Sequence, residues 1–320
     1  MLGIKARRPG KAGKNECLKM SVRFWKNKRV LITGFEGFLG SHLTRRLINL
    51  GVQPVGLDIK VGRRETILNN LDYRKITVIK GSVADYKLIA GIIKRYQINV
   101  IFHLAAEALV GECLKDPLKA FASNIQGTWN ILEAARQAGQ IEAIVMASSD
   151  KAYGSHKLLP YKEEAPLKGD HPYDVSKSCA DLIAYTYAHT YGLPVAVTRC
   201  GNIYGPGDFN FSRLIPDAMR CLAQSKTLKV RSDGKFLRDY VFVDDICAGY
   251  LKIARLLRNK QLSGESFNLS DESPLTVIQL LGRINRLKLK GRQLKFKILN
   301  QAKYEIRKQY LSALKARRVL

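Results

Sequence analysis

Short apolar runs alternate with longer amphipathic segments along most of the chain, from residue 29 to residue 224. An apolar run bounded by polar or glycine positions predicts a buried strand, whereas apolar positions that recur with a helical period predict a helix. These patterns predict strands at 29–33, 54–58, 76–80, 99–104, 142–148 and 195–200, and helices at 38–50, 86–96, 117–138, 173–191 and 213–224. Strands that alternate with helices in this way predict an α/β fold built on a doubly wound parallel sheet.

The regular alternation divides the chain into three expected parts. Residues 1–22 are rich in Lys, Gly and Arg, show neither period, and are expected to form a flexible basic leader. Residues 23–204 are expected to form the sheet domain. After Tyr204-Gly205-Pro206-Gly207 the pattern is less regular, as we expect of a smaller C-terminal lobe over 205–320 that covers a substrate.

A glycine-rich segment, Thr33–Gly40, joins the first predicted strand to the first predicted helix. Gly34 permits a tight turn, Gly37 lets backbone amides approach a pyrophosphate, and Gly40 lets the helix pack close to the sheet. Asp58 ends the next predicted strand, 18 residues after Gly40. An acid there bonds the adenosine ribose hydroxyls and repels a 2′-phosphate, so the arrangement predicts a Rossmann domain that binds NAD rather than NADP. A simple strand-end cap is the alternative role for Asp58.

Other cofactor contacts follow from the same geometry. Small side chains at the end of the fourth predicted strand would let a dinucleotide lie flat against the sheet, and the first turn of the first helix faces its phosphates. The further residues predicted to contact NAD are Phe38, Leu39, Ala105, Ala106, Tyr173 and Lys177.

A cluster of acid/base residues lies downstream of this loop. Tyr173 and Lys177 are four residues apart on a predicted helix, so their side chains share one face, where the ammonium can lower the pKa of the phenol. Ser149 lies at the end of a predicted strand, positioned to orient a substrate hydroxyl. The adjacent Asp150-Lys151 adds a second acid/base unit that a simple alcohol oxidation does not need, with a surface ion pair as its alternative reading.

Charge is concentrated at the two ends of the chain. The 320 residues carry 54 Lys and Arg against 27 Asp and Glu, a net charge of +27. Residues 1–30 contain ten basic residues and one acid, and residues 283–320 contain thirteen and one, which leaves +6 for the middle. The catalytic body therefore does not have the charge of a nucleic-acid-binding protein, although the basic ends could touch a polyanion.

The remaining composition excludes several classes. No apolar run is long enough to span a membrane. The six cysteines are scattered without metal-ligand spacing, so we expect no metal site and reduced thiols in a cytoplasmic protein. His103 lies within an apolar strand and is expected to be a buried, hydrogen-bonded core residue rather than a catalyst.

Taken together, these motifs resemble the extended short-chain dehydrogenase/reductase superfamily. Within it the chain resembles the NAD-dependent epimerase/dehydratase family and above all the nucleotide-sugar 4,6-dehydratases of the CDP-glucose type. The matching segments follow the family order over residues 24–270: Phe24-Trp25, Thr33–Gly40, His103–Ala106, Asn124-x-x-Gly127-Thr128, Ser149–Lys151, Tyr173–Lys177, Arg199-x-Gly201-Asn202-x-Tyr204-Gly205 and Arg213–Asp217.

The resemblance implies NAD-dependent conversion of an NDP-hexose to its 4-keto-6-deoxy form. Tyr173 would take the C4 hydroxyl proton, with Ser149 orienting that hydroxyl and Lys177 bonding the nicotinamide ribose. Asp150 would protonate the departing C6 hydroxyl, and Lys151 would act as the base at C5. Two alternatives stay open. A 4-epimerase would need only Ser149, Tyr173 and Lys177, and a NAD-binding protein without turnover would act through its basic ends.

The resemblance also indicates a substrate site and a partner. Asn202 and Arg238 are candidates for the substrate pyrophosphate, with Arg213 and Arg231 as further contacts. The long amphipathic helices 117–138 and 173–191 could pair with their copies in a homodimer.

Three features depart from the pattern of the CDP-glucose enzymes. Ser82 stands where the family has an Asp near the adenine. The segment Arg238–Asp245 is closer to that of the epimerases. The last residues, 309–320, resemble a family segment that is followed by more chain, which leaves open a C-terminally shortened fragment that lacks part of the sugar-nucleotide pocket.

Overall fold

A seven-stranded parallel sheet forms the centre of the protein. The computed structural model describes residues 23–63, 65–259, 261–287, 291–302 and 306–320, so the leader expected at 1–22 lies outside the described residues. The strand order is β11-β6-β5-β4-β1-β2-β3, with the chain starting in the middle and winding outward in both directions. This is the doubly wound, Rossmann-like arrangement expected from the sequence. The strands are β1 (Val30–Thr33), β2 (Val55–Asp58), β3 (Thr77–Lys80), β4 (Val100–His103), β5 (Ala143–Ala147), β6 (Val195–Cys200) and β11 (Ser266–Leu269).

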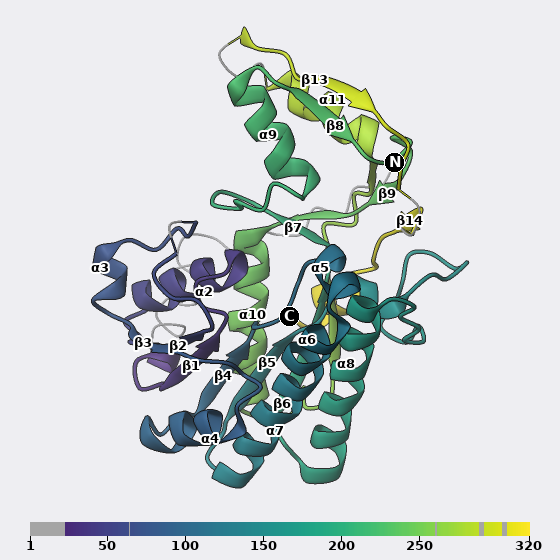
Figure 1. Ribbon diagram of the computed structural model, residues 1–320. Coiled ribbons are helices and arrows are strands. Elements are labelled where there is room, and N and C mark those ends of the chain that lie inside the picture. Colours follow the sequence, from purple (N-terminus) through teal and green to yellow (C-terminus); the bar gives the residue numbers. More distant parts are fainter. Residues whose placement is uncertain (1–22, 64, 260, 288–290, 303–305) are drawn as a thin grey trace, which may run out of the picture.

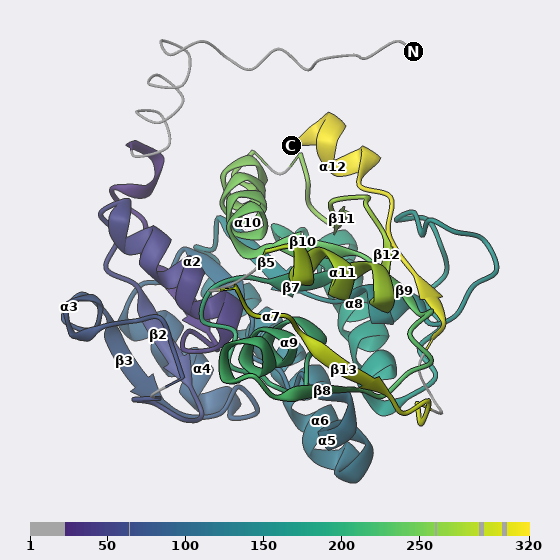
Figure 2. The ribbon, with the colours of Figure 1, turned by 90° about the horizontal axis from the view of Figure 1, so that it is seen from above.

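Helices cover both faces of the sheet (Figures 1 and 2). Successive residues of one strand point to opposite faces, so Val30 and Ile32 pack into one apolar core while Leu31 packs into the other. The first core is closed by α2 (Phe38–Asn49), α10 (Val243–Leu257) and α12 (Leu314–Val319). The second core is closed by α4 (Tyr86–Arg95), α7 (Gly127–Ala138) and α8 (Pro172–Tyr191). Two short helices, α5 (Val110–Lys115) and α6 (Pro117–Phe121), lie beside α8. The short helix α3 (Asn70–Tyr73) lies near the β3 edge of the sheet.

The helix predicted over 117–138 is not uniform. It consists of α6, a π-helical turn η1 (Ala122–Gln126) and α7. Within the π turn the buried Asn124 donates its amide to Glu107 O at 3.0 Å and to Ser176 Oγ at 2.9 Å, and accepts from Glu107 N at 2.7 Å. Insertions of this kind occur often at functional sites. Here the inserted turn ties the helix to the loop after β4 and to α8.

A smaller lobe lies at the carboxyl end of the sheet strands (Figure 1). It has its own apolar core, which includes Leu222, Leu228, Val230 and Leu281. Its elements are α9 (Leu214–Gln224), β8 (Thr227–Val230), α11 (Val277–Arg286) and β13 (Lys295–Ile298), joined to the sheet domain through β7 (Asn202–Tyr204), β9 (Leu237–Arg238), β10 (Tyr240–Phe242), β12 (Leu275–Thr276) and β14 (Lys308–Gln309).

The structure divides the chain differently from the sequence prediction, which placed the whole of 205–320 in the smaller lobe. β11 pairs with β6, placing Phe267 opposite Thr198, and α10 and α12 pack on the sheet. The chain therefore crosses between the two parts several times. Sequence periodicity cannot reveal this, because the returning strand is short and its partner lies some seventy residues earlier.

Candidate active site

The glycine-rich loop between β1 and α2 has the geometry that a dinucleotide phosphate requires. Gly34 has a left-handed φ of 71°, and a Cβ there would lie 2.9 Å from Ala105 N. A Cβ on Gly40 would lie 2.0 Å from Gly34 O, so only glycine allows α2 to start this close to the turn. Gly37 is the N-cap of α2, whose first amides are free of intrahelical partners. The residues therefore fit a pyrophosphate at the N-terminus of this helix.

The other predicted cofactor residues border this loop. Asp58 is buried at the carboxyl end of β2, and its carboxylate accepts from Lys60 N at 3.2 Å and from Arg63 Nη2 at 2.6 Å. Ala105 N donates to Thr33 Oγ1 at 3.1 Å, which places the Ala105-Ala106 pair beside Gly34. Phe38 and Leu39 lie in the first turn of α2 and are half-buried. Sequence analysis did not single out Arg63.

Ser149, Tyr173 and Lys177 come together where β5 ends against α8. Ser149 is the N-cap of the 3₁₀ turn η2 (Asp150–Tyr153), and its side chain interacts with the Tyr173 phenol. The Lys177 Nζ lies 5.9 Å from the centre of the Tyr173 ring and donates to Ala147 O at 2.9 Å. The first helical turn of α8 thus presents the phenol and the ammonium on one face, as the four-residue spacing predicts.

The protonation of Tyr173 differs from the sequence expectation. Burial raises the pKa of Tyr173, while the Ser149 side chain opposes the rise and the nearby Asp150 adds to it. Desolvation is the largest cause, so the phenol is neutral at physiological pH in the cofactor-free protein. A nearby cation lowers the pKa of a phenol, but the cost of removing the phenolate from water raises it and can cancel that effect.

Asp150 is an internal carboxyl rather than a surface one. It is 5% exposed, Ser149 Oγ donates to its Oδ1 at 3.1 Å, and its backbone carbonyl accepts from Gln309 Nε2 at 2.8 Å. Burial raises the pKa of Asp150, opposed by the charges of Lys151 and Arg238. Burial likewise raises the pKa of Asp174 to about 6, again opposed by Lys151. Asp150 is thus buried and hydrogen-bonded to the Ser149 hydroxyl. A surface ion pair, the alternative reading of Asp150-Lys151, would leave its carboxylate exposed.

The four predicted substrate residues are in different situations. Arg213 and Arg231 are both exposed beside the loop at 208–213: Arg213 Nη1 lies 3.3 Å from Asp208 Oδ2, and Arg231 Nη2 donates to Ser212 O at 3.1 Å. The charge of Arg213 opposes the rise in the pKa of Tyr173. Asn202 is exposed and bonds Asp239 O at 3.1 Å.

Arg238 is buried in a different role from the one expected. Its guanidinium donates to Leu237 O at 2.9 Å and to the backbone carbonyls of Ile306 and Arg307. It therefore holds the C-terminal segment beneath Asp150, and the structure shows no direct preparation of this side chain for a pyrophosphate. Gln309 and Leu311, which the sequence analysis also missed, belong to the same segment, where Leu311 N donates to Asp239 Oδ2 at 2.7 Å. No local sequence motif predicts these long-range contacts.

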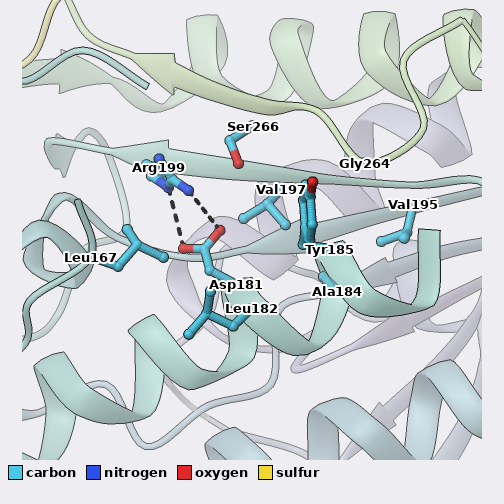
Figure 3. Close-up of a pocket in the computed structure, with 10 residues that line it drawn as sticks. All are labelled: Leu167, Asp181, Leu182, Ala184, Tyr185, Val195, Val197, Arg199, Gly264 and Ser266. Atoms are coloured by element: carbon cyan, nitrogen blue, oxygen red, sulfur yellow. Dashed lines mark hydrogen bonds and ion pairs between the residues drawn. The ribbon is translucent and has the colours of Figure 1, made fainter. Parts of the chain in front are cut away.

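A separate cavity lies between α8 and the edge of the sheet formed by β6 and β11 (Figure 3). Asp181 and Arg199 face each other across it, with Arg199 Nε 3.3 Å from Asp181 Oδ2. Ser148 Oγ donates to the same carboxylate at 2.6 Å, and Arg199 Nη1 bonds the Tyr153 hydroxyl at 2.9 Å. Every charged group here has a partner and no predicted catalytic residue lines the cavity, so this ion pair stabilises the packing of α8 against β6.

His103 has the role expected from the sequence. It is buried at the end of β4, between Thr33 Oγ1, 2.8 Å from Nδ1, and Thr128 Oγ1, 3.4 Å from Nε2. Burial lowers its pKa to about 3, so the ring is neutral. Within the described ranges, no group of three or more His, Cys, Asp or Glu side chains could hold a metal ion. Among those same residues, no helix is both long and apolar enough to cross a bilayer.

Comparison with known proteins decides the family. Residues 30–270 match the model of the NAD dependent epimerase/dehydratase family. The chain belongs to this family. It is 30% identical over 272 residues to the CDP-glucose 4,6-dehydratase of Salmonella typhimurium, covering 79% of this chain and 74% of that enzyme. It is also 30% identical over 306 residues to the UDP-glucuronate 4-epimerase of Thermodesulfobacterium geofontis, covering 91% and 89%.

Solved structures agree with this membership. The dTDP-glucose 4,6-dehydratase DesIV of Streptomyces venezuelae, determined with NAD bound, superposes with a TM-score of 0.78 at 30% identity and covers 91% of this chain and 90% of its own. As a member of the NAD dependent epimerase/dehydratase family, the protein uses NAD as its cofactor. The relatives include both dehydratases and epimerases of nucleotide sugars, and they support an enzyme of this kind.

The buried ammonium of this family member gives a testable pH dependence. Burial lowers the pKa of Lys177 from 10.5 to about 8, opposed by Asp181. Between those two pH values the unfolded chain binds more protons at this position than the folded protein, so the stability of the wild type rises with pH relative to Lys177→Met. Below about pH 8 both states are protonated and the difference is constant.

We expect urea unfolding of the cofactor-free proteins to show this slope. From pH 7 to pH 9.5 the wild type should gain about 2 kcal/mol relative to Lys177→Met. Lys157→Met, which changes an exposed lysine, is the matched control and should show no such gain. An unchanged difference between wild type and Lys177→Met would mean that Lys177 titrates as it does in water.

Proposed function

We propose that the protein is a nucleotide-sugar 4,6-dehydratase that converts an NDP-hexose, with a CDP-glucose-like substrate favoured, to its 4-keto-6-deoxy form. The observation that carries this proposal is Asp150, a buried carboxyl directly after Ser149 and bonded to its hydroxyl. A proton-bearing acid beside the C4-oxidising residues is required for removing the C6 hydroxyl as water, and oxidation and reduction at C4 alone do not need it.

The residues can be assigned to the steps in order. Tyr173 acts as a phenolate, which the Lys177 ammonium stabilises, and removes the proton from the C4 hydroxyl that Ser149 orients. Bound NAD would supply the acceptor for the C4 hydride and its later donor to C6. Lys151 removes the C5 proton, made acidic by the neighbouring ketone, and Asp150 protonates the departing C6 hydroxyl, so that one water leaves. When C6 receives the hydride, the Lys151 ammonium returns the proton to C5.

The pKa shift of Asp150 supports its assignment, and that of Tyr173 sets a condition on its role. The raised pKa of Asp150 keeps its proton available at a higher pH than an exposed Asp would, as a general acid requires. The raised pKa of Tyr173 means that the phenol is neutral in the cofactor-free protein, so it must release its own proton before it can accept the one from the C4 hydroxyl. Both shifts have burial as their largest cause.

A 4-epimerase is the second candidate, and two observations favour it. The UDP-glucuronate 4-epimerase from Thermodesulfobacterium geofontis aligns over more of this chain than the CDP-glucose 4,6-dehydratase does. The segment Arg238–Asp245 also resembles that of epimerases. An epimerase would use Ser149, Tyr173 and Lys177 and would leave Asp150 without a chemical role.

Substrate binding is assigned to the exposed arginines. Arg213 ends the loop at 208–213 and Arg231 bonds Ser212 of the same loop, and a pair of guanidinium groups suits a diphosphate. Asn202 lies at the same junction between sheet and lobe. Arg238 is assigned to the floor of the pocket, since its donors are taken by backbone carbonyls and its charge acts on Asp150.

A panel of CDP-, dTDP-, UDP- and GDP-hexoses tests the proposal. Each is incubated with the NAD-loaded enzyme, and the products are analysed by mass spectrometry and NMR. We expect a product lighter than its substrate by one water from at least one sugar, with the CDP sugar turned over fastest. A product of unchanged mass with an inverted C4 would establish the epimerase instead, and no turnover of any sugar would favour a NAD-binding protein without activity.

We also propose a homodimer that pairs α7 and α8 with their copies. These helices and the neighbouring α5 and α6 expose large apolar side chains on one face, namely Val110, Leu114, Leu118, Trp129, Leu182, Tyr185 and Tyr191. Monomeric proteins rarely leave such a contiguous apolar surface uncovered. A twofold axis would bring the same face of each subunit together.

Leu182→Glu is expected to separate the subunits, because a charge would be buried at the centre of the paired helices. Light scattering on a gel-filtration column should give twice the chain mass of 35.9 kDa for the wild type and the single chain mass for the variant. Leu158→Glu, which changes a more exposed leucine in a loop, should stay dimeric. A monomeric wild type or a dimeric Leu182→Glu would overturn this proposal.

A further inference from the structure

An arginine pairs with the acid predicted to read the cofactor ribose. Arg63 lies five residues after Asp58, in the loop that follows β2, and its Nη2 lies 2.6 Å from Asp58 Oδ1. The Asp58 side chain is 4% exposed and the Arg63 side chain 32% exposed, so the carboxylate is internal and the guanidinium covers it from the solvent side. The charge of Asp58 is therefore already balanced before a ligand arrives.

The position of Arg63 is fixed from the phosphate loop itself. Glu36, the only acid among residues 33–40, is 1% exposed, and its two carboxylate oxygens accept from Gly62 N at 2.7 Å and Arg63 N at 2.8 Å. A buried carboxylate that accepts two backbone amides is held firmly, and such charged hydrogen bonds are strong. Glu36 thus joins the pyrophosphate loop to the loop that carries Arg63.

A carboxylate in this place is unfavourable for phosphate binding unless it has another task. A negative charge beside a pyrophosphate repels it, and a buried charge must be compensated by hydrogen bonds. The hydrogen bonds from Gly62 N and Arg63 N compensate the buried charge of Glu36. They also fix the backbone of Arg63, whose guanidinium then reaches Asp58. The geometry therefore connects three positions, Glu36, Arg63 and Asp58, at the adenosine end of the site.

We propose that Arg63, held in place by Glu36, is a specificity-determining residue of the adenosine-ribose site. Arg63 engages Oδ1 of Asp58 and leaves Oδ2 to accept from the ribose hydroxyls of NAD. In the wild type the charge of Arg63 is paired with Asp58, so a 2′-phosphate meets a neutral pair at this position. Without Asp58, the same guanidinium becomes a ligand for the 2′-phosphate of NADP. The proposal concerns cofactor binding only and rests on Asp58 facing the ribose, so its failure is separate from failure of the proposed sugar chemistry.

A double-mutant cycle measured by calorimetry tests the proposal without any sugar substrate. Dissociation constants for NAD and NADP are determined for the wild type, Arg63→Met, Asp58→Ser and the double variant. The Asp58→Ser protein should bind NADP about 10- to 100-fold more tightly than the double variant, the range of a charge-assisted phosphate contact, while their NAD affinities agree within about threefold. Arg63→Met alone should weaken NAD about threefold to tenfold, because Asp58 loses its orientation.

Asp58→Asn, which keeps the shape of the acid, is run as a second background in case the serine variant folds poorly. Glu36→Gln in either background should lose most of the gain in NADP affinity, and this selective loss distinguishes positioning of Arg63 from a general loosening that would weaken both cofactors alike. Arg45→Met is the matched control, since it removes an arginine that pairs with Asp72 at 2.9 Å away from the ribose. Equal NADP affinity with and without Arg63 in both backgrounds would overturn the proposal.

Discussion

Tyr173→Phe is expected to lower kcat by about 10²- to 10⁴-fold, the usual contribution of a positioned general base. The substitution removes one hydroxyl from a side chain that contacts Ser149 and lies 5.9 Å from the Lys177 ammonium. No other phenol in the described part of the cluster replaces it. Hydride can leave C4 only if the C4 hydroxyl loses its proton. Formation of the ketone and every later step therefore depend on this group. Stopped-flow absorbance at 340 nm after mixing enzyme, NAD and sugar measures the loss directly.

The affinity for NAD distinguishes this chemical loss from a structural one. We expect Tyr173→Phe to bind NAD within about threefold of the wild type, because the phenol is not among the groups that hold the phosphates. Tyr185→Phe, on the exposed side of the same helix, is the matched control and should keep full activity. A kcat within threefold of the wild type for Tyr173→Phe would remove the phenol from the mechanism.

Asp150→Asn is expected to stop the reaction after oxidation. An amide of the same shape keeps the packing around Ser149 but has no proton of suitable acidity to give to the C6 hydroxyl. We expect formation of the 4-keto-6-deoxy product to fall by about 10²- to 10⁴-fold, while absorbance at 340 nm shows that the C4 hydride is still transferred. Lys151→Ala should give the same separation, since the C5 proton then has no base.

Asp170→Asn changes an exposed acid in the loop before α8 and serves as the control for Asp150→Asn. Its product formation should match the wild type. If Asp150→Asn and Lys151→Ala both leave product formation unchanged, the pair has no part in elimination and the dehydratase assignment fails, even if Tyr173 is essential.

The sheet was predictable because its signal is local. Each of the six predicted strands contains the observed one, and the first five begin one residue before it. Parallel strands buried on both faces appear in the sequence as short apolar runs. The glycine loop after the first of them was also predictable, because side chains at Gly34 and Gly40 would collide with backbone atoms. Ser149, Tyr173 and Lys177 were predicted together because a strand end and one helix turn determine where they meet.

What sequence reasoning missed depends on contacts between distant segments. Arg238 has the sequence context of a phosphate ligand, yet carbonyls nearly seventy residues later take up its donors. The π turn at Asn124 leaves almost no trace in the apolar period, because one inserted residue shifts the pattern by a fraction of a turn. Glu36 could have been singled out from the sequence. An acid inside a phosphate-binding loop is an unfavourable charge, and this predicts that it has another role.

The central claim is that the C4 hydrogen moves to C6 as water leaves. The most direct measurement uses CDP-glucose labelled with deuterium at C4, or the best substrate of the panel labelled in the same way, with NMR of the product. The account predicts a 4-keto-6-deoxy sugar that carries the deuterium in its C6 methyl group. A product with an inverted C4 that retains the deuterium at C4 would contradict it and identify the protein as an epimerase.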